Sequence, residues 1–119
     1  MQTILIVDHV ASQRELLRAW LKDDYIVYTA ADAATGMALA AQTEPDLIFL
    51  ALPDRDGGEV ACRLKTQARL RDTLLIALTA PALPGEGPRA WAAGWADTIH
   101  TPLDEEQVAA TLRKWLGGG

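Results

Sequence analysis

Short apolar runs alternate with stretches of helical periodicity along the whole 119-residue chain. Runs rich in β-branched residues, such as TILIV near the start, predict buried strands. Apolar residues spaced three and four apart, such as Leu16, Leu17, Trp20 and Leu21, predict a helix with one buried face, which Ser12 is placed to cap. The expected strands cover residues 3–7, 25–29, 47–52, 74–78 and 97–100, and the expected helices cover 12–21, 32–42, 59–68, a short segment ending at Ala93 before Gly94, and 104–116.

This strand–helix alternation predicts an α/β fold with a parallel sheet covered on both faces. Residues 1–116 suffice for one domain, and the three glycines at 117–119 form a tail or the start of a linker. In such folds a site lies at the carboxyl ends of the strands. Those ends are Asp8-His9, residues 50–52, Thr79-Ala80 and residues 100–102.

Composition narrows the class of protein. Apolar residues make up 50% of the chain, which excludes disorder, and no apolar run approaches the ~20 residues of a membrane span. The net charge of −5 makes the domain a poor candidate for binding nucleic acid. The lone Cys62 has no thiol partner, and the N-terminus resembles no secretion signal, so we expect a cytoplasmic protein.

Eight short motifs follow one another along the chain: ILIVD at 4–8, RELLRAWL at 14–21, YTAAD at 28–32, PDLIFL at 45–50, LPDRDGGEVACRLK at 52–65, LIALTA at 75–80, AAG at 92–94 and TPLD at 101–104. This ordered set resembles the receiver domains of two-component response regulators. The resemblance implies a flavodoxin-like (βα)5 three-layer sandwich with strand order 2-1-3-4-5.

The resemblance also implies a pocket in which an acidic pair and an acceptor aspartate hold Mg²⁺, while a lysine and a hydroxyl bind the phosphoryl group. Asp8 matches the first acid, but His9 stands at the second. Thr79 matches the hydroxyl position. Thr101 occupies the lysine position, and Thr98 occupies the position of the aromatic switch residue.

The acceptor position has no carboxylate on either way of counting. Counting forward from Pro45 places it at Ala51, and counting back from Pro53 places it at Phe49, because the segment is two residues shorter than the family's usual spacing. Neither alanine nor phenylalanine can be phosphorylated. The sequence therefore predicts a degenerate receiver, a protein-interaction module that signals without phosphorylation and is not an enzyme.

Two alternatives remain open. Asp54 or Asp56 could act as a displaced phosphoacceptor, although Asp-Gly segments before a helix are usually turns. A flavodoxin-like sheet could instead bind a small ligand or cofactor. Under the leading hypothesis of a degenerate receiver, we expect no cofactor and no bound metal.

For partners, we expect a protein, a second copy or an attached output domain. The resemblance implies that it would dock on the face formed by the fourth helix, fifth strand and fifth helix. Trp91 and Trp95 lie there and are the candidate interface residues.

Overall fold

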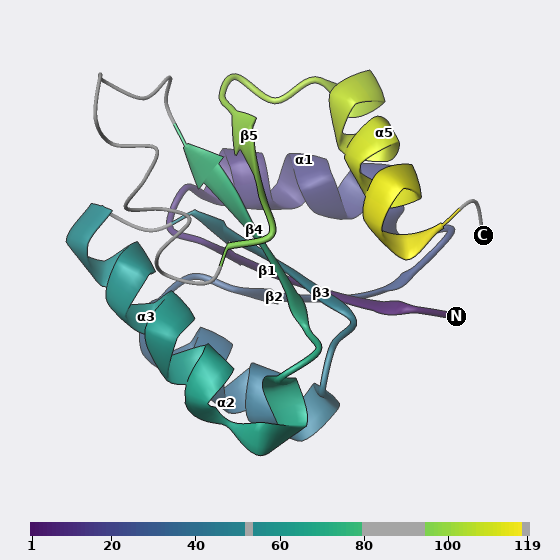
Figure 1. The fold of residues 1–119 in the computed structure, drawn as a ribbon. Helices are drawn as coiled ribbons and strands as arrows, with labels where there is room; N and C mark the ends of the chain where they lie inside the picture. The colour runs from purple at the N-terminus through teal and green to yellow at the C-terminus, as the bar shows by residue number, and fades with distance from the viewer. Residues whose placement is uncertain (52–53, 80–94, 118–119) are drawn as a thin grey trace.

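The computed structural model describes residues 1–51, 54–79 and 95–117, with the backbone alone for residues 54–59. Strands and helices alternate along residues 1–79, and one more strand and helix follow in residues 95–117 (Figure 1). The elements are β1 (Thr3–Asp8), α1 (Ala11–Leu21), β2 (Ile26–Ala30), α2 (Ala33–Thr43), β3 (Leu47–Ala51), α3 (Asp54–Thr66), the short 3-10 helix η1 (Ala68–Leu70), β4 (Leu74–Thr79), β5 (Asp97–His100) and α5 (Glu105–Leu116).

The strands form one parallel sheet in the order β2-β1-β3-β4-β5, so the predicted topology is confirmed. Figure 1 shows α1 and α5 on one face of the sheet and α2 and α3 on the other. This three-layer arrangement buries the strands from both sides, which is why they read as continuous apolar runs. Within the described ranges, no helix is long and apolar enough to cross a membrane.

Alternate side chains of each strand supply two separate core clusters. From β1, Ile4 and Ile6 pack with Leu17 of α1 on one face, whereas Leu5 and Val7 pack beneath α2 and α3 on the other. All residues of β3 are buried. The period-2 geometry of a strand thus lets one apolar run fill both layers of the core.

Helix α2 lies unusually close to the sheet because Gly36 faces β1. A Cβ atom at Gly36 would lie 2.7 Å from Cγ2 and 2.9 Å from Cγ1 of Val7. Asp32 caps the helix, as its sequence position suggests, by accepting a hydrogen bond from the Thr35 amide at 2.8 Å.

The first helix differs from expectation at its start and on one face. Val10 occupies the N-cap position without a side-chain cap, so the prediction that Ser12 caps the helix is wrong. Leu16 is 42% exposed, while Leu17 and Leu21 are buried. The buried face of α1 therefore includes fewer of its apolar residues than the sequence pattern indicates.

The third helix also begins earlier than predicted. It runs from Asp54, so the DRDGG segment forms its first turns and not a loop, although Val60, Ala61 and Leu64 are buried as expected. Aspartate and glycine are compatible with a helix start as well as with a turn. The predicted fourth helix, with Trp91 and Gly94, lies outside the described residues.

Candidate functional site

The carboxyl edge of the sheet brings the predicted pocket residues into one region. In the β1–β3 ladder, Asp8 pairs with Ala51, and both residues end their strands. Phe49 lies two positions back from that end and is fully buried in the core. Of the two counts made from the sequence, the forward one therefore finds the residue at the strand end.

The carboxylate of Asp8 is fully buried and bonded within the chain. Its Oδ1 accepts a hydrogen bond from the Val10 amide at 2.9 Å, and its Oδ2 accepts one from the Gln13 side chain at 2.6 Å. The Arg14 guanidinium donates to the Asp8 carbonyl oxygen at 2.8 Å. Asp8 therefore ties the end of β1 to the first turn of α1, and Gln13 covers one of its oxygens.

His9 is the first residue after β1. Its side chain is exposed, and Nδ1 donates to the carbonyl oxygen of Ala51 at 2.9 Å, with the His9 amide 3.3 Å from the same oxygen. A carbonyl oxygen can only accept, so this contact places a proton on Nδ1. His9 thus joins the ends of β1 and β3 and does not form an acidic pair with Asp8.

The other half of the edge is formed by β4 and β5. The Thr101 amide donates to the Thr79 carbonyl oxygen at 2.7 Å, and the Thr101 hydroxyl lies 3.4 Å from that oxygen. The Thr79 hydroxyl lies 3.5 Å from Nδ1 of the exposed His100, too long for a strong hydrogen bond. The Thr101-Pro102 peptide bond is cis. Thr98 is half-buried.

These residues do not fit the octahedral oxygen coordination that Mg²⁺ requires. Asp8 is the one acidic side chain that ends β1, β3 or β4, and both of its oxygens already have hydrogen-bond donors. Among the side chains described, no group of three histidine, cysteine, aspartate or glutamate residues could hold a metal ion. The side chains of Asp54 and Asp56 lie outside the described residues.

Sequence reasoning missed Gln13 and Arg14. Each contacts Asp8 because α1 begins two residues after β1, so that the half-buried side chains of its first turn lie at the strand end. A residue five or six positions after a strand-end aspartate can reach it in this geometry. This spacing is the feature of the sequence from which the contacts of Gln13 and Arg14 with Asp8 could have been predicted.

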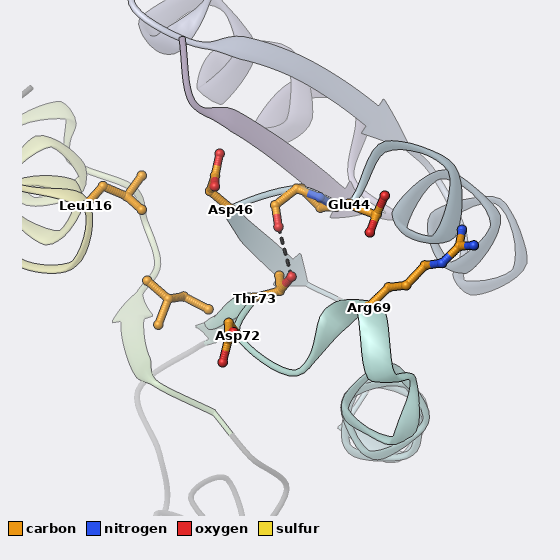
Figure 2. A pocket seen from close by; sticks show the side chains of 8 residues that line it. Glu44, Asp46, Arg69, Asp72, Thr73 and Leu116 are labelled. Atoms are coloured by element: carbon orange, nitrogen blue, oxygen red, sulfur yellow. Dashed lines mark hydrogen bonds between the residues drawn. The ribbon is translucent and has the colours of Figure 1, made fainter.

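A second polar region lies at the opposite, amino edge of the sheet. A hollow of about 370 Å³ opens there, and Figure 2 shows Asp46 and Thr73 on its rim, with Leu116 of α5 on the other side of the opening from Arg69. The Thr73 hydroxyl donates to the Pro45 carbonyl oxygen at 2.8 Å, and Asp46 accepts from the Thr3 amide at 2.8 Å. These side chains hold loops to strands.

On the face formed by β5 and α5, the side chain of Asp97 links the strand to the helix. Asp97 accepts hydrogen bonds from the Trp115 indole at 2.9 Å and the Thr98 amide at 2.8 Å, and Lys114 lies 3.6 Å away. Partial burial acts to raise the pKa of Asp97, but these donors and the Lys114 charge outweigh it and hold the pKa below its usual value. Trp95 is half-buried and packs against the cluster beneath α2 and α3.

A family model and individual relatives of known name all assign this chain to the same family. Residues 4–113 match the family model described as the response regulator receiver domain. Response regulator PleD of Caulobacter vibrioides is 35% identical over 115 residues, a match that covers 92% of this chain and 25% of that protein. The transcriptional regulator RpaA of Synechocystis is 34% identical, with 98% of this chain and 49% of that protein covered. The chain thus spans half or less of these relatives.

Solved structures agree with this match. The chemotaxis protein CheY4 of Vibrio cholerae has a TM-score of 0.90 at 27% identity and covers 97% of this chain and 98% of its own. The receiver domain of the sensor histidine kinase PA1611 of Pseudomonas aeruginosa, solved with a magnesium ion coordinated in its active site cleft, has a TM-score of 0.87 at 28% identity, with 98% of each chain covered.

Proposed function

Because this chain belongs to the response regulator receiver domain family of two-component signalling, we propose that it is a receiver that signals without aspartyl phosphorylation. It acts as a protein-interaction module and catalyses no reaction of its own. The observation that carries the proposal is the carboxyl edge itself. There, Ala51 ends β3 opposite Asp8, and the Asp8 carboxylate is buried and bonded to Val10 and Gln13.

Phosphoryl transfer depends on positioning and on charge stabilisation of the phosphoryl oxygens. The side chains of Ala51, His9 and Thr101 offer no nucleophilic carboxylate, no second acid and no ammonium at the places where the family resemblance expects them. Thr79 and Thr101 each leave a hydroxyl on the edge. A hydroxyl can bind a phosphoryl oxygen, but it cannot neutralise its charge.

The comparison with the PA1611 receiver supports the same conclusion. That domain coordinates magnesium in its cleft. In this chain Gln13 donates to the Asp8 Oδ2 at 2.6 Å, so a side chain of α1 already occupies part of the coordination space around that oxygen. The neutral Val10 and Gln13 amides satisfy hydrogen-bonding sites of the buried carboxylate, although they do not neutralise its charge.

For the docking surface, we propose the face formed by β5 and α5 together with the segment before β5. The outward residues of α5 include Glu105, Gln107, Arg113 and Lys114, which are exposed and of mixed charge. Such a surface suits a protein partner or an output domain more than a nucleic acid. Trp91 and Trp95 remain the candidate interface residues. The half-buried position of Trp95 against the core favours Trp91 as the contact residue of the two.

The direct test is incubation of the protein with acetyl phosphate and Mg²⁺, followed by intact mass spectrometry. We expect no mass gain of one phosphoryl group under conditions that label a receiver with an aspartate at this position. Labelling that disappears in Asp54→Asn or Asp56→Asn would instead establish a displaced phosphoacceptor. Labelling that survives both substitutions would also overturn the proposal.

A further inference from the structure

The two outer strands of the sheet differ in how they are protected against pairing with another strand. β5 is four residues long, carries Asp97 and His100, and runs directly into Thr101-Pro102. Short length, charge and proline are the usual devices that block an open sheet edge. β2 is one residue longer and carries neither a charged residue nor a proline, since its sequence is IVYTA. The β2 edge is therefore open to a further strand.

The backbone of β2 has one set of groups free for such pairing. In the described part of the sheet, β2 pairs with β1 alone. The Ile26 amide donates to the Gln2 carbonyl oxygen at 3.0 Å, so Ile26 faces β1. Because backbone groups alternate sides along a strand, the amides and carbonyls of Val27 and Thr29 face outward.

The side chains around this edge are apolar and almost uncharged. Ile26 is 43% exposed and Tyr28 is 39% exposed, and their register with Thr3 and Leu5 places both on the α2 side of the sheet. Across residues 25–43, Asp32 is the single charged residue, whereas charged residues make up 23% of the whole chain. Strand β2 and helix α2 thus form one charge-poor surface.

We propose that the β2 edge pairs antiparallel with the β2 edge of a second copy of this chain, centred on Tyr28. In this register Val27 of one copy exchanges both backbone hydrogen bonds with Thr29 of the other. The two Tyr28 side chains meet as a directly opposed pair without hydrogen bonds between them, the arrangement with the closest side-chain contact. Ile26 then lies opposite Ala30. The result is one continuous sheet through both copies, with the two α2 helices on the same side.

Several features favour a second copy as the occupant. The outward pair Val27 and Thr29 is symmetric about Tyr28, the middle residue of the strand, so the edge is complementary to itself under a two-fold axis. Each copy has a net charge of −5, and this charge-poor surface lets two copies approach with little repulsion. The exposed aromatic ring also suits an aromatic partner at the centre of the interface.

The test is sedimentation velocity over a concentration series under reducing conditions, with two variants and a control. Tyr28→Lys places like charges opposite each other, and Thr29→Pro removes an outward amide that the sheet itself does not use. We expect the wild-type chain to dimerise and each variant to weaken dimerisation by roughly tenfold or more, with unchanged circular dichroism. Cys62→Lys, the same charge change at an exposed position on α3, should dimerise like the wild type.

Amide hydrogen exchange identifies the face that is used. Protection of the Val27 and Thr29 amides should rise with protein concentration. A chain that stays monomeric at millimolar concentration overturns the inference. A dimer that leaves these two amides unprotected also overturns it, and this second result leaves the proposed phosphorylation-independent function untouched. Labelling by acetyl phosphate would contradict that function without bearing on β2.

Discussion

The two ends of the sheet use polar side chains in the same way. At the amino end, Asp46 holds the Thr3 amide and Thr73 holds the Pro45 carbonyl oxygen. At the carboxyl end, Asp8 holds Val10 and Gln13, and His9 holds the Ala51 carbonyl oxygen. In both places the side chain joins a strand end to a neighbouring segment of the same polypeptide.

In a parallel α/β sheet, the carboxyl end is where ligands bind. Among the described side chains of that end, Ala51 and Thr101 are uncharged and the Asp8 carboxylate accepts hydrogen bonds from within the chain. Under the proposed function, the carboxyl end carries no phosphoryl site, and the polar side chains at both ends serve to hold the fold together. If this equivalence is correct, substitutions at both ends should affect stability alone.

The largest effect is expected at Asp8. In an acidic pocket, removal of one carboxylate relieves repulsion and stabilises the fold. Here Asp8→Ala leaves the Val10 amide and the Gln13 side chain without their acceptor, so the free energy of unfolding should fall by about 3 kcal/mol. Urea unfolding measures this. Gln13→Ala, which opens one carboxylate oxygen, should cost less, and an increase in stability for Asp8→Ala would mean that the carboxylate is repelled by other acids.

Thr73→Val is the matched substitution at the amino end. The Thr73 side chain is 5% exposed, and its loss as a donor leaves the Pro45 carbonyl oxygen unpaired. We expect a loss of about 1–3 kcal/mol in the free energy of unfolding, because a buried polar group then lacks its partner. Thr43→Val, which loses a bond from the half-buried Thr43 to Leu39 within α2, serves as the control and should cost less.

Asp97 should make part of the stability dependent on pH. The Trp115 indole, the Thr98 amide and Lys114 hold the pKa of Asp97 below its value in the unfolded chain, despite partial burial. The stabilisation is then fully present above the unfolded pKa of about 4 and is lost as the pH falls through the lower folded pKa. Asp97→Asn should lower stability by less than about 1 kcal/mol at pH 7, since the site is partly open to water. This difference should shrink in melts recorded at progressively lower pH below 4.

The smallest effect is expected at Thr79. Its hydroxyl contacts His100 at 3.5 Å, so Thr79→Val should change the free energy of unfolding by less than about 0.5 kcal/mol. It should also leave binding of a protein partner unchanged. A loss of partner binding in Thr79→Val, measured by calorimetry, would give the carboxyl end a functional role that the amino end lacks.

Most of the fold could be predicted from the sequence because it depends on local pattern. The predicted strand at residues 97–100 coincides with β5, and the strand order follows from the family resemblance. The start of α1 was missed because the helix already begins at Ala11, so that Ser12, a favoured capping residue type, lies inside its first turn. The start of α3 was missed because DRDGG is typical of turns as well as of first helical turns.

The candidate site was predictable in residue type but not in contacts. The sequence places Asp8, His9, Thr79 and Thr101 at strand ends, and the structure puts them there. The link from Asp8 to Gln13 depends on the angle between β1 and α1, which no local pattern encodes. The sequence also left Ala51 and Phe49 as equal candidates, and only strand register distinguishes them.

Magnesium titration followed by amide chemical shifts tests the central claim most directly, because the family resemblance implies a Mg²⁺ site to which Asp8 would contribute. We expect the amides of Asp8, His9 and Gln13 to show no saturable shift at Mg²⁺ concentrations up to roughly ten millimolar, since Mg²⁺ requires several oxygen ligands. Saturable shifts at these residues below about one millimolar would contradict the account, because they would show that the carboxyl end retains a working metal site.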